Sequence, residues 1–264
     1  MNILIAGGHG YLGSYLVNAF SKYNVTVLTR DCNITDTVSL INPDIIINTV
    51  CSYGRNNETI SSIYDSNFRV GVELLSAASQ LDKKIVFINC GTSLDKNTNL
   101  YSISKAHLVE IGKFVSNNKL KFINMNLQHF YGPDAKNNFI SYVINGCLSN
   151  STIPLTTGIQ KRDFIYITDV VNAFDAVVKN TDILLSFENI DVGSGSTVSI
   201  KELVQQIKVM TNSTSFLDFG IKETRQNEVL EMLANNKRLV SLGWSPTVDL
   251  LQGLKLTIEY YNEK

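Results

Sequence analysis

The sequence has few of the residues that build metal centres and disulfide frameworks. Its 264 residues include only four cysteines and three histidines. The cysteines are widely spaced and form no Cys-x-x-Cys pair; they are Cys32, Cys51, Cys90 and Cys147. This spacing argues against a zinc site and against a disulfide framework. We therefore expect no metal site, and we expect reduced thiols, as in a cytoplasmic protein.

An excess of one charge and a long apolar run are also missing. Lysine and arginine number 23 and aspartate and glutamate 24, which gives a net charge of −1. This balance argues against a nucleic-acid groove and against a polybasic membrane patch. No apolar run approaches the ~18 residues that a membrane span needs. The N-terminal residues MNILIAGG lack a basic region and a cleavage site, so they favour a β-strand over a signal peptide.

The first half of the chain alternates short apolar runs with amphipathic stretches. The apolar runs are rich in β-branched residues on both faces, which is typical of buried parallel strands. The expected strands are Asn2–Ala6, Val25–Thr29, Asp44–Thr49, Lys84–Asn89 and Lys121–Asn126. The expected helices are Tyr11–Tyr23, Ile63–Leu81 and Leu100–Asn117. This alternation predicts an α/β fold with a doubly wound parallel sheet.

The pattern loosens after Tyr131, where Gly132-Pro133 marks a break. Helices are expected at Asn138–Leu148, Asp169–Lys179, Ser199–Met210 and Leu250–Tyr261, and a late strand at Phe187–Val192. Ser199 with Glu202 three residues later matches a capping box. We expect a larger domain from residues 1–131 and 164–193, and a smaller lobe from residues 132–163 and 194–264. Ligands of such sheets bind at the carboxyl ends of the strands.

Three glycines follow the first expected strand in the pattern Gly7-x-x-Gly10-x-x-Gly13. Gly7 allows a tight turn, Gly10 lets the backbone approach a pyrophosphate, and Gly13 allows close packing of helix on strand. The N-terminus of the next helix then faces the phosphates. A turn that only needs small residues is the alternative. The position of the glycines between a strand and a helix favours a dinucleotide site.

The end of the second expected strand bears on which dinucleotide binds. An acidic residue at this strand tip binds the ribose hydroxyls in NAD-preferring folds. Here the strand ends Val27-Leu28-Thr29-Arg30, and Arg30 is suited to pair with a 2′-phosphate. The sequence therefore favours NADPH. NADH stays open because Asp31 is next in the chain, and a plain surface arginine is the other interpretation of Arg30.

Tyr101 and Lys105 lie four residues apart on an expected helix and therefore share one face. A phenol with a pKa of about 10 is a poor acid–base at neutral pH, and a nearby ammonium lowers that pKa. Thr92 follows an expected strand, so its hydroxyl lies at the carboxyl edge and is placed to bind a substrate oxygen. The alternatives are a chance pair on a helix and a threonine that caps a turn.

Ordered motifs along nearly the whole chain resemble the extended short-chain dehydrogenase/reductase family of nucleotide-sugar enzymes, which has a Rossmann fold. In the first half these are GGHGYLG (7–13), PDIIINTV (43–50), DSNFRVGVELLSAA around Asn67, FINCGTS (87–93) and YSISK (101–105). In the second half they are FYGP (130–133), QKRDFIYITDVVNAF (160–174), DVGSGSTVSI (191–200), TRQNEV (224–229) and LGWSPT (242–247).

The resemblance implies roles for individual residues. Tyr101 would donate or accept the proton, Lys105 would assist it and bind the ribose, and Thr92 would be the family's Ser/Thr. The larger domain would bind NADP(H) and the lobe a sugar nucleotide. The cofactor set would be Gly7, Gly10, Tyr11, Leu12, Gly13, Arg30, Asn33, Ile34, Thr49, Val50, Asn67 and Lys105. The substrate set would be Tyr53, Arg55, Thr92, Tyr101, His129, Arg162 and Arg225, with the last two arginines on the nucleotide and diphosphate.

Departures from the family pattern narrow the expected activity. The dehydratase branch carries Asp-Glu after the Ser/Thr, whereas this chain has Ser93 and Leu94. His129 stands where the family has Asn, which puts the sugar-phosphate contact there in doubt. The short segment between the second and third strands resembles the 4-keto-sugar reductase branch.

Within that branch, NTVCSYGRNNE (48–58) and NLQHFYGP (126–133) look like CDP-abequose and CDP-paratose synthases. The resemblance implies NADPH-dependent reduction of the 4-keto group of a CDP-3,6-dideoxyhexulose for bacterial surface polysaccharide. A 4-epimerase with tightly bound NAD and a non-catalytic NADP sensor are the competing functions. The family also implies a homodimer through the helices near Ile63–Leu81 and Leu100–Asn117.

Overall fold

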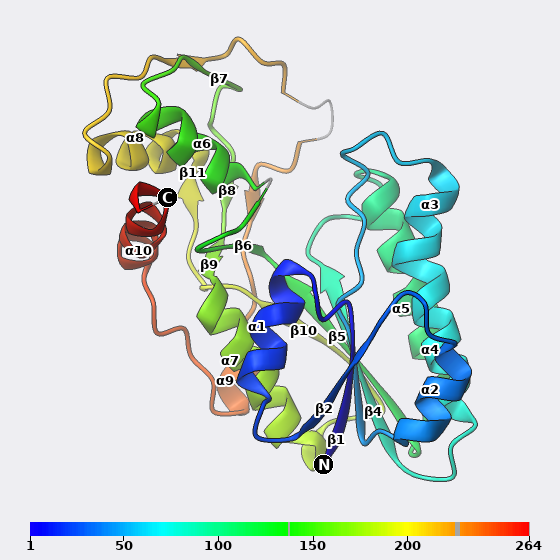
Figure 1. Cartoon of the computed structure of the whole chain (residues 1–264). Helices are drawn as coiled ribbons and strands as arrows, with labels where there is room; N and C mark the ends of the chain where they lie inside the picture. The colour runs from blue at the N-terminus through cyan, green and yellow to red at the C-terminus, as the bar shows by residue number, and fades with distance from the viewer. Residues whose placement is uncertain (137, 225–227, 264) are drawn as a thin grey trace. The chain divides into compact units, whose positions relative to one another are not determined.

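The computed structural model describes residues 1–136, 138–224 and 228–263 (Figure 1). It divides into two compact units. The first unit comprises Met1–Leu127, Val171–Asp191 and Arg238–Trp244. The second comprises Gln128–Val170, Val192–Lys237 and Ser245–Lys264. No helix among the described residues is long and apolar enough to span a bilayer.

A six-stranded sheet forms the centre of the first unit, in the order β10-β5-β4-β3-β1-β2. The strands are β1 (Asn2–Ala6), β2 (Asn24–Leu28), β3 (Ile45–Asn48), β4 (Ile85–Thr92), β5 (Leu120–Leu127) and β10 (Phe187–Val192). The strands from β2 to β5 pair in parallel. The order reverses at β1, which lies between β2 and β3, so the crevice at the carboxyl ends of β1 and β3 is the expected ligand position.

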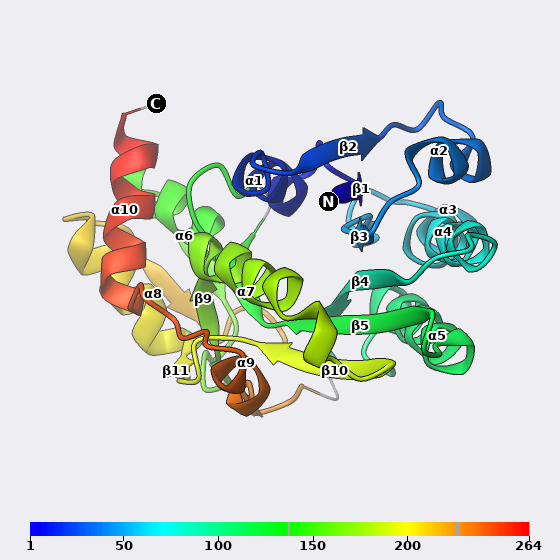
Figure 2. The same ribbon diagram turned by 90° about the horizontal axis from the view of Figure 1, so that it is seen from below.

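Helices cover both faces of this sheet, as Figure 2 shows, which confirms the predicted doubly wound α/β fold. One face carries α2 (Ile34–Ile41), α4 (Val70–Ser79) and α5 (Leu100–Val115), and the other carries α1 (Tyr11–Ala19) and α7 (Ile167–Lys179). Fully buried apolar side chains join the first layer to the sheet, among them Leu74, Phe87, Leu108 and Phe122. The Phe87 and Phe122 rings stack with centroids 5.4 Å apart. The turn η2 (Thr181–Ile183) and α9 (Lys237–Ser241) also belong to this region.

Two helical segments differ from the sequence expectation. The apolar pattern does not predict α2, which Asn33 caps by accepting the Asp36 N–H at 3.1 Å. The helix expected at Ile63–Leu81 begins earlier, with α3 (Ile60–Tyr64), and a π-helical segment, η1 (Asp65–Arg69), separates α3 from α4. Such π-bulges are frequent at functional sites.

The second unit combines short strands with three longer helices. Its strands pair as β6 (His129–Tyr131) with β9 (Phe164–Tyr166), β7 (Ile153–Leu155) with β12 (Leu217–Phe219), and β8 (Lys161–Arg162) with β11 (Val198–Ser199) and β13 (Glu231–Met232). Its helices are α6 (Phe139–Leu148), α8 (Ile200–Met210) and α10 (Leu250–Asn262). The predicted capping box at the start of α8, Ser199 with Glu202, is confirmed.

Buried Asp163 ties the connections of this unit together. Its carboxylate accepts the N–H groups of Ser194, Gly195 and Ala234 at 2.7 to 3.2 Å. These bonds join two separate parts of the chain to the same side chain. Asp163 therefore fixes the segments that follow β10 and β13 next to β8.

Candidate active site

The glycine loop between β1 and α1 has no room for side chains. Gly7 has φ +80°, and a Cβ there would lie 2.6 Å from Thr49 Oγ1. A Cβ on Gly13 would lie 2.1 Å from the Gly7 carbonyl oxygen. Gly10 caps α1 without a side-chain hydrogen bond, so the first N–H groups of the helix meet no capping side chain. This cradle fits a pyrophosphate, because helix N-termini bind anions through such N–H groups.

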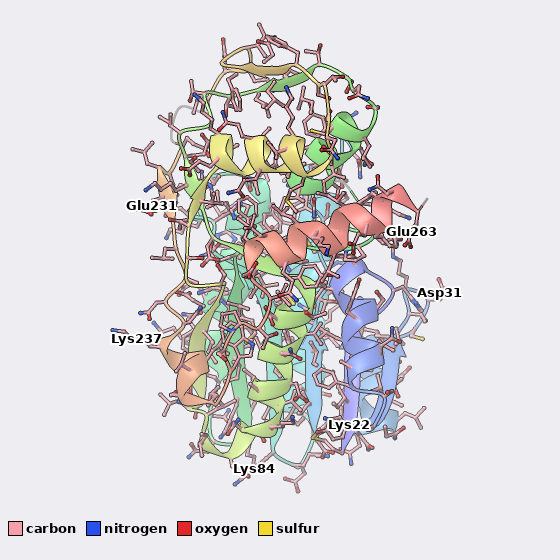
Figure 3. All side chains as sticks on the ribbon, turned by 90° about the vertical axis from the view of Figure 1, so that its left-hand side faces the viewer. Lys22, Asp31, Lys84, Glu231, Lys237 and Glu263 are labelled. Atoms are coloured by element: carbon pink, nitrogen blue, oxygen red, sulfur yellow. The ribbon has the colours of Figure 1, made fainter. Side chains whose placement is uncertain are left out.

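The tip of β2 places Arg30 and Asp31 next to each other, and both are exposed. Figure 3 shows Asp31 at the end of β2 opposite to Lys22. The Arg30 guanidinium makes no hydrogen bond or ion pair within the described residues, so it is available to an anionic ligand. Asn33 and Ile34, both predicted to contact the cofactor, are the N-cap and first residue of α2. Their cofactor contacts stay predictions.

The segment after β3 is fixed by two buried asparagine side chains. The Val50 N–H donates to Asn48 Oδ1 at 3.2 Å. The Asn67 amide, on η1, accepts the Ser52 N–H at 2.7 Å and donates to the Ser52 carbonyl at 2.8 Å. Asn67 is fully buried and also contacts Ser104 Oγ at 3.0 Å. Its amide therefore holds the loop after β3 in place, and its predicted contact with the cofactor stays a prediction.

Thr92 and Tyr101 meet at the carboxyl end of β4. An Asn99–Ser102 capping box begins α5 two residues before Tyr101. The Leu94 N–H donates to Thr92 Oγ1 at 3.3 Å. Burial of the phenol raises the pKa of Tyr101 well above its usual value, while Thr92 acts on the pKa in the opposite direction. Thr92 and Tyr101, both predicted to be catalytic, thus act on each other, and the raised pKa keeps the Tyr101 phenol protonated at neutral pH.

Lys105 lies one helical turn after Tyr101 and is only 1% exposed. Its ammonium donates to the Val50 carbonyl at 2.8 Å and to the Cys90 carbonyl at 3.1 Å. Burial outweighs any lowering of the Tyr101 pKa, including the effect of Thr92. Cys51, Tyr53 and Cys90 are among the groups that also raise this pKa. The predicted effect of Lys105 on Tyr101 stays a prediction.

A thiol and a second phenol lie against Tyr101. Burial raises the pKa of the Cys51 thiol, and the Tyr53 and Tyr101 phenols act to lower it. The Tyr53 and Tyr101 rings lie 5.0 Å apart, and the Arg55 guanidinium carbon lies 4.8 Å from the centre of the Tyr53 ring. Sequence analysis predicts Tyr53 and Arg55 for the substrate pocket but misses Cys51. Its place two residues before Tyr53, just after the β3 strand, was the available signal.

The remaining predicted substrate residues belong to the second unit. Arg162 on β8 is 5% exposed, its guanidinium is paired with Glu228, and it donates to the Lys161 carbonyl at 2.7 Å. His129 begins β6, and its ring centroid lies 5.6 Å from that of Phe164. Arg225 lies outside the described residues. The substrate contacts of Arg162, His129 and Arg225 stay predictions.

The part of the chain that the structure describes contains no group of three or more His, Cys, Asp or Glu side chains placed to hold a metal ion. All four cysteines are free, with Cys32 and Cys51 exposed and Cys90 and Cys147 buried. Burial raises the pKa of Cys90 to about 12. The chemistry available in the first unit is therefore that of hydroxyls, thiols and one buried ammonium, beside a cradle for a dinucleotide.

The sequence profile described as "NAD dependent epimerase/dehydratase family" matches residues 3–193. The chain belongs to this family. The glycine cradle and the Thr92–Tyr101–Lys105 cluster both lie within the matched residues. The predicted family resemblance is thereby confirmed.

Full-length relatives narrow the similarity within the family. CDP-abequose synthase from Salmonella typhimurium is 32% identical over 96% of both chains, and that from Salmonella muenchen is 31% identical over 96% of this chain and 95% of its own. A putative UDP-glucose 4-epimerase from Methanocaldococcus jannaschii is 25% identical over 98% of this chain and 97% of its own. The predicted likeness to CDP-abequose synthases is confirmed.

Solved structures share the fold over the whole chain. UDP-glucose 4-epimerase from Thermotoga maritima, solved with UDP-glucose, is similar with a TM-score of 0.83 and 21% identity, covering 100% of this chain and 99% of its own. MoeE5 in complex with UDP-glucuronic acid and NAD gives 0.85 and 19%, with the same coverage. At these identities the likeness shows the fold alone.

Proposed function

We propose that this protein reduces the 4-keto group of a nucleotide-activated deoxyhexulose, with NADPH as the reductant. The favoured substrate is a CDP-3,6-dideoxyhexulose, and the favoured setting is bacterial surface polysaccharide synthesis in the cytoplasm. The full-length likeness to CDP-abequose synthases supports this substrate class. We propose that the first unit binds the cofactor and that the second binds the sugar nucleotide.

The observation that carries the proposal is the buried phenol of Tyr101, kept protonated by its raised pKa, together with Thr92, which lowers that pKa and is followed by Ser93 and Leu94. A protonated phenol at the carboxyl edge of the sheet is suited to donate a proton to a developing alkoxide. Elimination of water would also need an acid and a base next to Thr92, and neither Ser93 nor Leu94 supplies one. Carbonyl reduction therefore suits this arrangement better than dehydration.

In the proposed reaction, bound NADPH supplies the hydride that adds to the carbonyl carbon. Tyr101 donates its phenolic proton to the carbonyl oxygen, and the resulting phenolate is stabilised by the Thr92 hydroxyl. Lys105 holds its positive charge one turn away and binds the ribose hydroxyls. The phenol then regains a proton from solvent.

Arg162 is proposed to bind the diphosphate of the substrate. Its guanidinium is almost fully buried and is paired with Glu228. A guanidinium presents two parallel N–H groups to a phosphate, so the diphosphate would replace or join the Glu228 carboxylate. Arg225 is proposed as the second diphosphate ligand. Their binding energy would hold the nucleotide end of the substrate.

The second candidate function is a 4-epimerase that keeps NAD tightly bound through its cycle. The likeness to a putative UDP-glucose 4-epimerase over nearly the whole chain favours it. Both functions use the same phenol, because each needs proton transfer at the oxygen on carbon 4. They differ in the fate of the cofactor.

The discriminating experiment mixes the purified protein with NADPH and an enzymatically generated CDP-4-keto-3,6-dideoxyhexose. We expect one NADPH to be oxidised for each sugar converted, with NADH less effective. Copurified NAD together with UDP-hexose epimerisation would favour the second candidate. The reductase proposal is wrong if no nucleotide-linked 4-ketohexose oxidises NADPH.

A further inference from the structure

Three asparagines form a chain of amide hydrogen bonds across the centre of the sheet. Asn48 on β3, Asn89 on β4 and Asn124 on β5 lie in register, and each is at most 2% exposed. Asn48 Nδ2 donates to Asn89 Oδ1 at 3.2 Å, and Asn89 Nδ2 donates to Asn124 Oδ1 at 2.9 Å. We call these three residues the asparagine ladder.

The ladder continues to the outer edge of the sheet. Asn124 Nδ2 donates to Asn126 Oδ1 at 2.7 Å and to Asn189 Oδ1 at 3.0 Å, and Asn126 donates to Asp191 at 3.2 Å. Gly91 leaves the space for it, because a Cβ there would lie 2.5 Å from Asn124 Oδ1. Each ladder amide donates in the same direction, away from β3, and aligned bonds of this kind strengthen one another.

This direction fixes how the Asn48 amide is turned. Because Asn48 Nδ2 is committed to Asn89, Asn48 Oδ1 faces its own strand end and accepts the Val50 N–H at 3.2 Å. A flipped amide would place two N–H donors against the Val50 N–H and would leave them unpaired in a buried position. The ladder thus selects one orientation of the Thr49–Val50 peptide, which sets the backbone entering Val50.

The carbonyls that hold Lys105 follow directly from ladder residues. Val50 lies two residues after Asn48, and Cys90 lies one residue after Asn89. No carboxylate lies within ion-pair distance of Lys105 in residues 1–136, 138–224 and 228–263. The buried ammonium therefore depends on these two carbonyls for its protein contacts.

We propose that Asn48 is a positioning residue for Lys105: it holds the N–H of Val50, the residue whose carbonyl receives the ammonium through the next peptide, and the ladder fixes Asn48. A role in strand register alone is the competing explanation. The kinetic part of this inference rests on the proposed function, because only there does Lys105 assist Tyr101 and bind the ribose. The part of the inference that concerns how Asn48 holds the contacts of Lys105 does not depend on the proposed function.

The test compares Asn48→Ala with Asn124→Ala, an equally buried ladder residue whose strand gives no carbonyl to Lys105. Each protein, without added cofactor, is treated with an amine-acylating reagent, and labelling of every lysine is followed by peptide mass spectrometry. Lys119, with a side chain 70% exposed, serves as the internal standard. We expect both variants to fold with similar losses of stability. We expect Lys105 to be acylated roughly tenfold faster or more in Asn48→Ala, and little changed in Asn124→Ala.

A conservative variant separates the two contacts of Asn48. Asn48→Ser keeps an acceptor for the N–H two residues on, as serine does in turns, but cannot reach Asn89. We expect it to restore most of the protection of Lys105. The proposal would be overturned if Lys105 were acylated equally slowly in all variants or equally fast in both alanine variants. It would also be overturned if Asn48→Ala alone failed to fold.

Kinetics supply the second readout. In Asn48→Ala we expect kcat at saturating NADPH to fall roughly tenfold to hundredfold, with the KM for the nucleotide sugar unchanged, because misplacement near the reacting groups costs rate. If the unmodified protein reduces no keto sugar, the proposed function fails, and the acylation result still decides the role of Asn48.

Discussion

Several neighbouring groups together determine the protonation state of the Tyr101 phenol. Its ring lies beside the Tyr53 ring, and Thr92 and Cys51 both act on its pKa. Burial raises this pKa and Thr92 lowers it, with burial the larger effect. At neutral pH the group is therefore a proton donor, which is the form that carbonyl reduction needs.

The Tyr101→Phe variant tests this role. The ring keeps its packing against Tyr53 while the proton is lost, so we expect kcat to fall roughly 10²- to 10⁴-fold, as for other general acids. Melting temperature and NADPH affinity should stay close to the parent values. Tyr53→Phe is the matched control, and an equal loss of kcat in both variants would contradict the assignment.

Arg30 is the residue on which cofactor choice depends. Its guanidinium is exposed, and a charge-assisted bond to a 2′-phosphate is worth about 1.5–3 kcal/mol. In Arg30→Ala we expect the Kd for NADPH, measured by fluorescence titration, to rise roughly tenfold or more, with the Kd for NADH unchanged. A parallel loss for both cofactors would mean that Arg30 does not contact the 2′-phosphate.

The raised pKa of the Cys90 thiol predicts how the stability of the protein depends on pH. Its folded pKa of about 12 lies above the ordinary 9.0, so the folded state keeps its proton longer than the unfolded chain. This contribution is complete below pH 9 and is lost as the pH rises towards 12. Melting temperatures of Cys90→Ala and the parent, measured from pH 7 to 11, should converge as the pH rises. A constant difference across this range would count against a buried neutral thiol.

At the residue scale, sequence reasoning identified which types of side chain meet but not which of them interact. It paired Tyr101 with Lys105 from their spacing, and in the structure the Lys105 ammonium donates to the carbonyls of Val50 and Cys90. Backbone carbonyls from two strands carry no sequence signal, so this contact was not predictable. The same holds for Cys51, whose contact with Tyr101 depends on the path of the loop after β3.

At the scale of single elements, Gly13 and Gly10 in the loop from β1 to α1 have different roles, one in packing and one in cofactor binding. A Cβ on Gly13 would lie 2.1 Å from a backbone oxygen, whereas one on Gly10 would lie 3.2 Å from the same atom. We expect Gly13→Ala to lower the free energy of unfolding by about 1–3 kcal/mol, because the backbone must move. Gly10→Ala should keep most of the stability but weaken NADPH binding. Chemical denaturation and cofactor titration measure the two effects, and a stable Gly13→Ala protein would show that the packing is looser.

The bounds of most strands in the six-stranded sheet followed the apolar pattern closely. β1 and β10 have the expected bounds, and β2, β3 and β5 differ by one residue at each end, as in β3 (Ile45–Asn48). The apolar pattern does not predict α2, because this helix has one buried residue, Val38. Its N-cap, Asn33, is predicted as a cofactor contact rather than as the start of a helix. The π segment η1 also escaped, since the hydrophobic period does not reveal one extra residue in a turn.

At the scale of the whole molecule, the family resemblance predicts a homodimer through α4 and α5. The outer face of α5 exposes apolar side chains, with Phe114 87%, Leu100 42% and Ile111 37% exposed. Helical spacing places these three on one side, and an apolar helix face of this kind marks an association surface. We propose that a second copy of this chain covers it.

Phe114→Glu tests this interface. We expect the dimer Kd, measured by analytical ultracentrifugation, to rise roughly tenfold or more, because a charge would be buried without a partner. Leu40→Glu on α2 is the control, since Leu40 is 84% exposed and lies on another helix. A monomeric parent protein, or an equal effect of both variants, would contradict a dimer through α5.

The central claim, that Tyr101 serves reduction of a 4-keto sugar nucleotide, is tested most directly by following the hydride. The protein is incubated with NADPH deuterated at the transferred position and a CDP-4-keto-3,6-dideoxyhexose, and the product is analysed by mass spectrometry and NMR. Our account predicts one deuterium at carbon 4 of the sugar and none elsewhere. A product without deuterium, or turnover that continues without added NADPH, would contradict it.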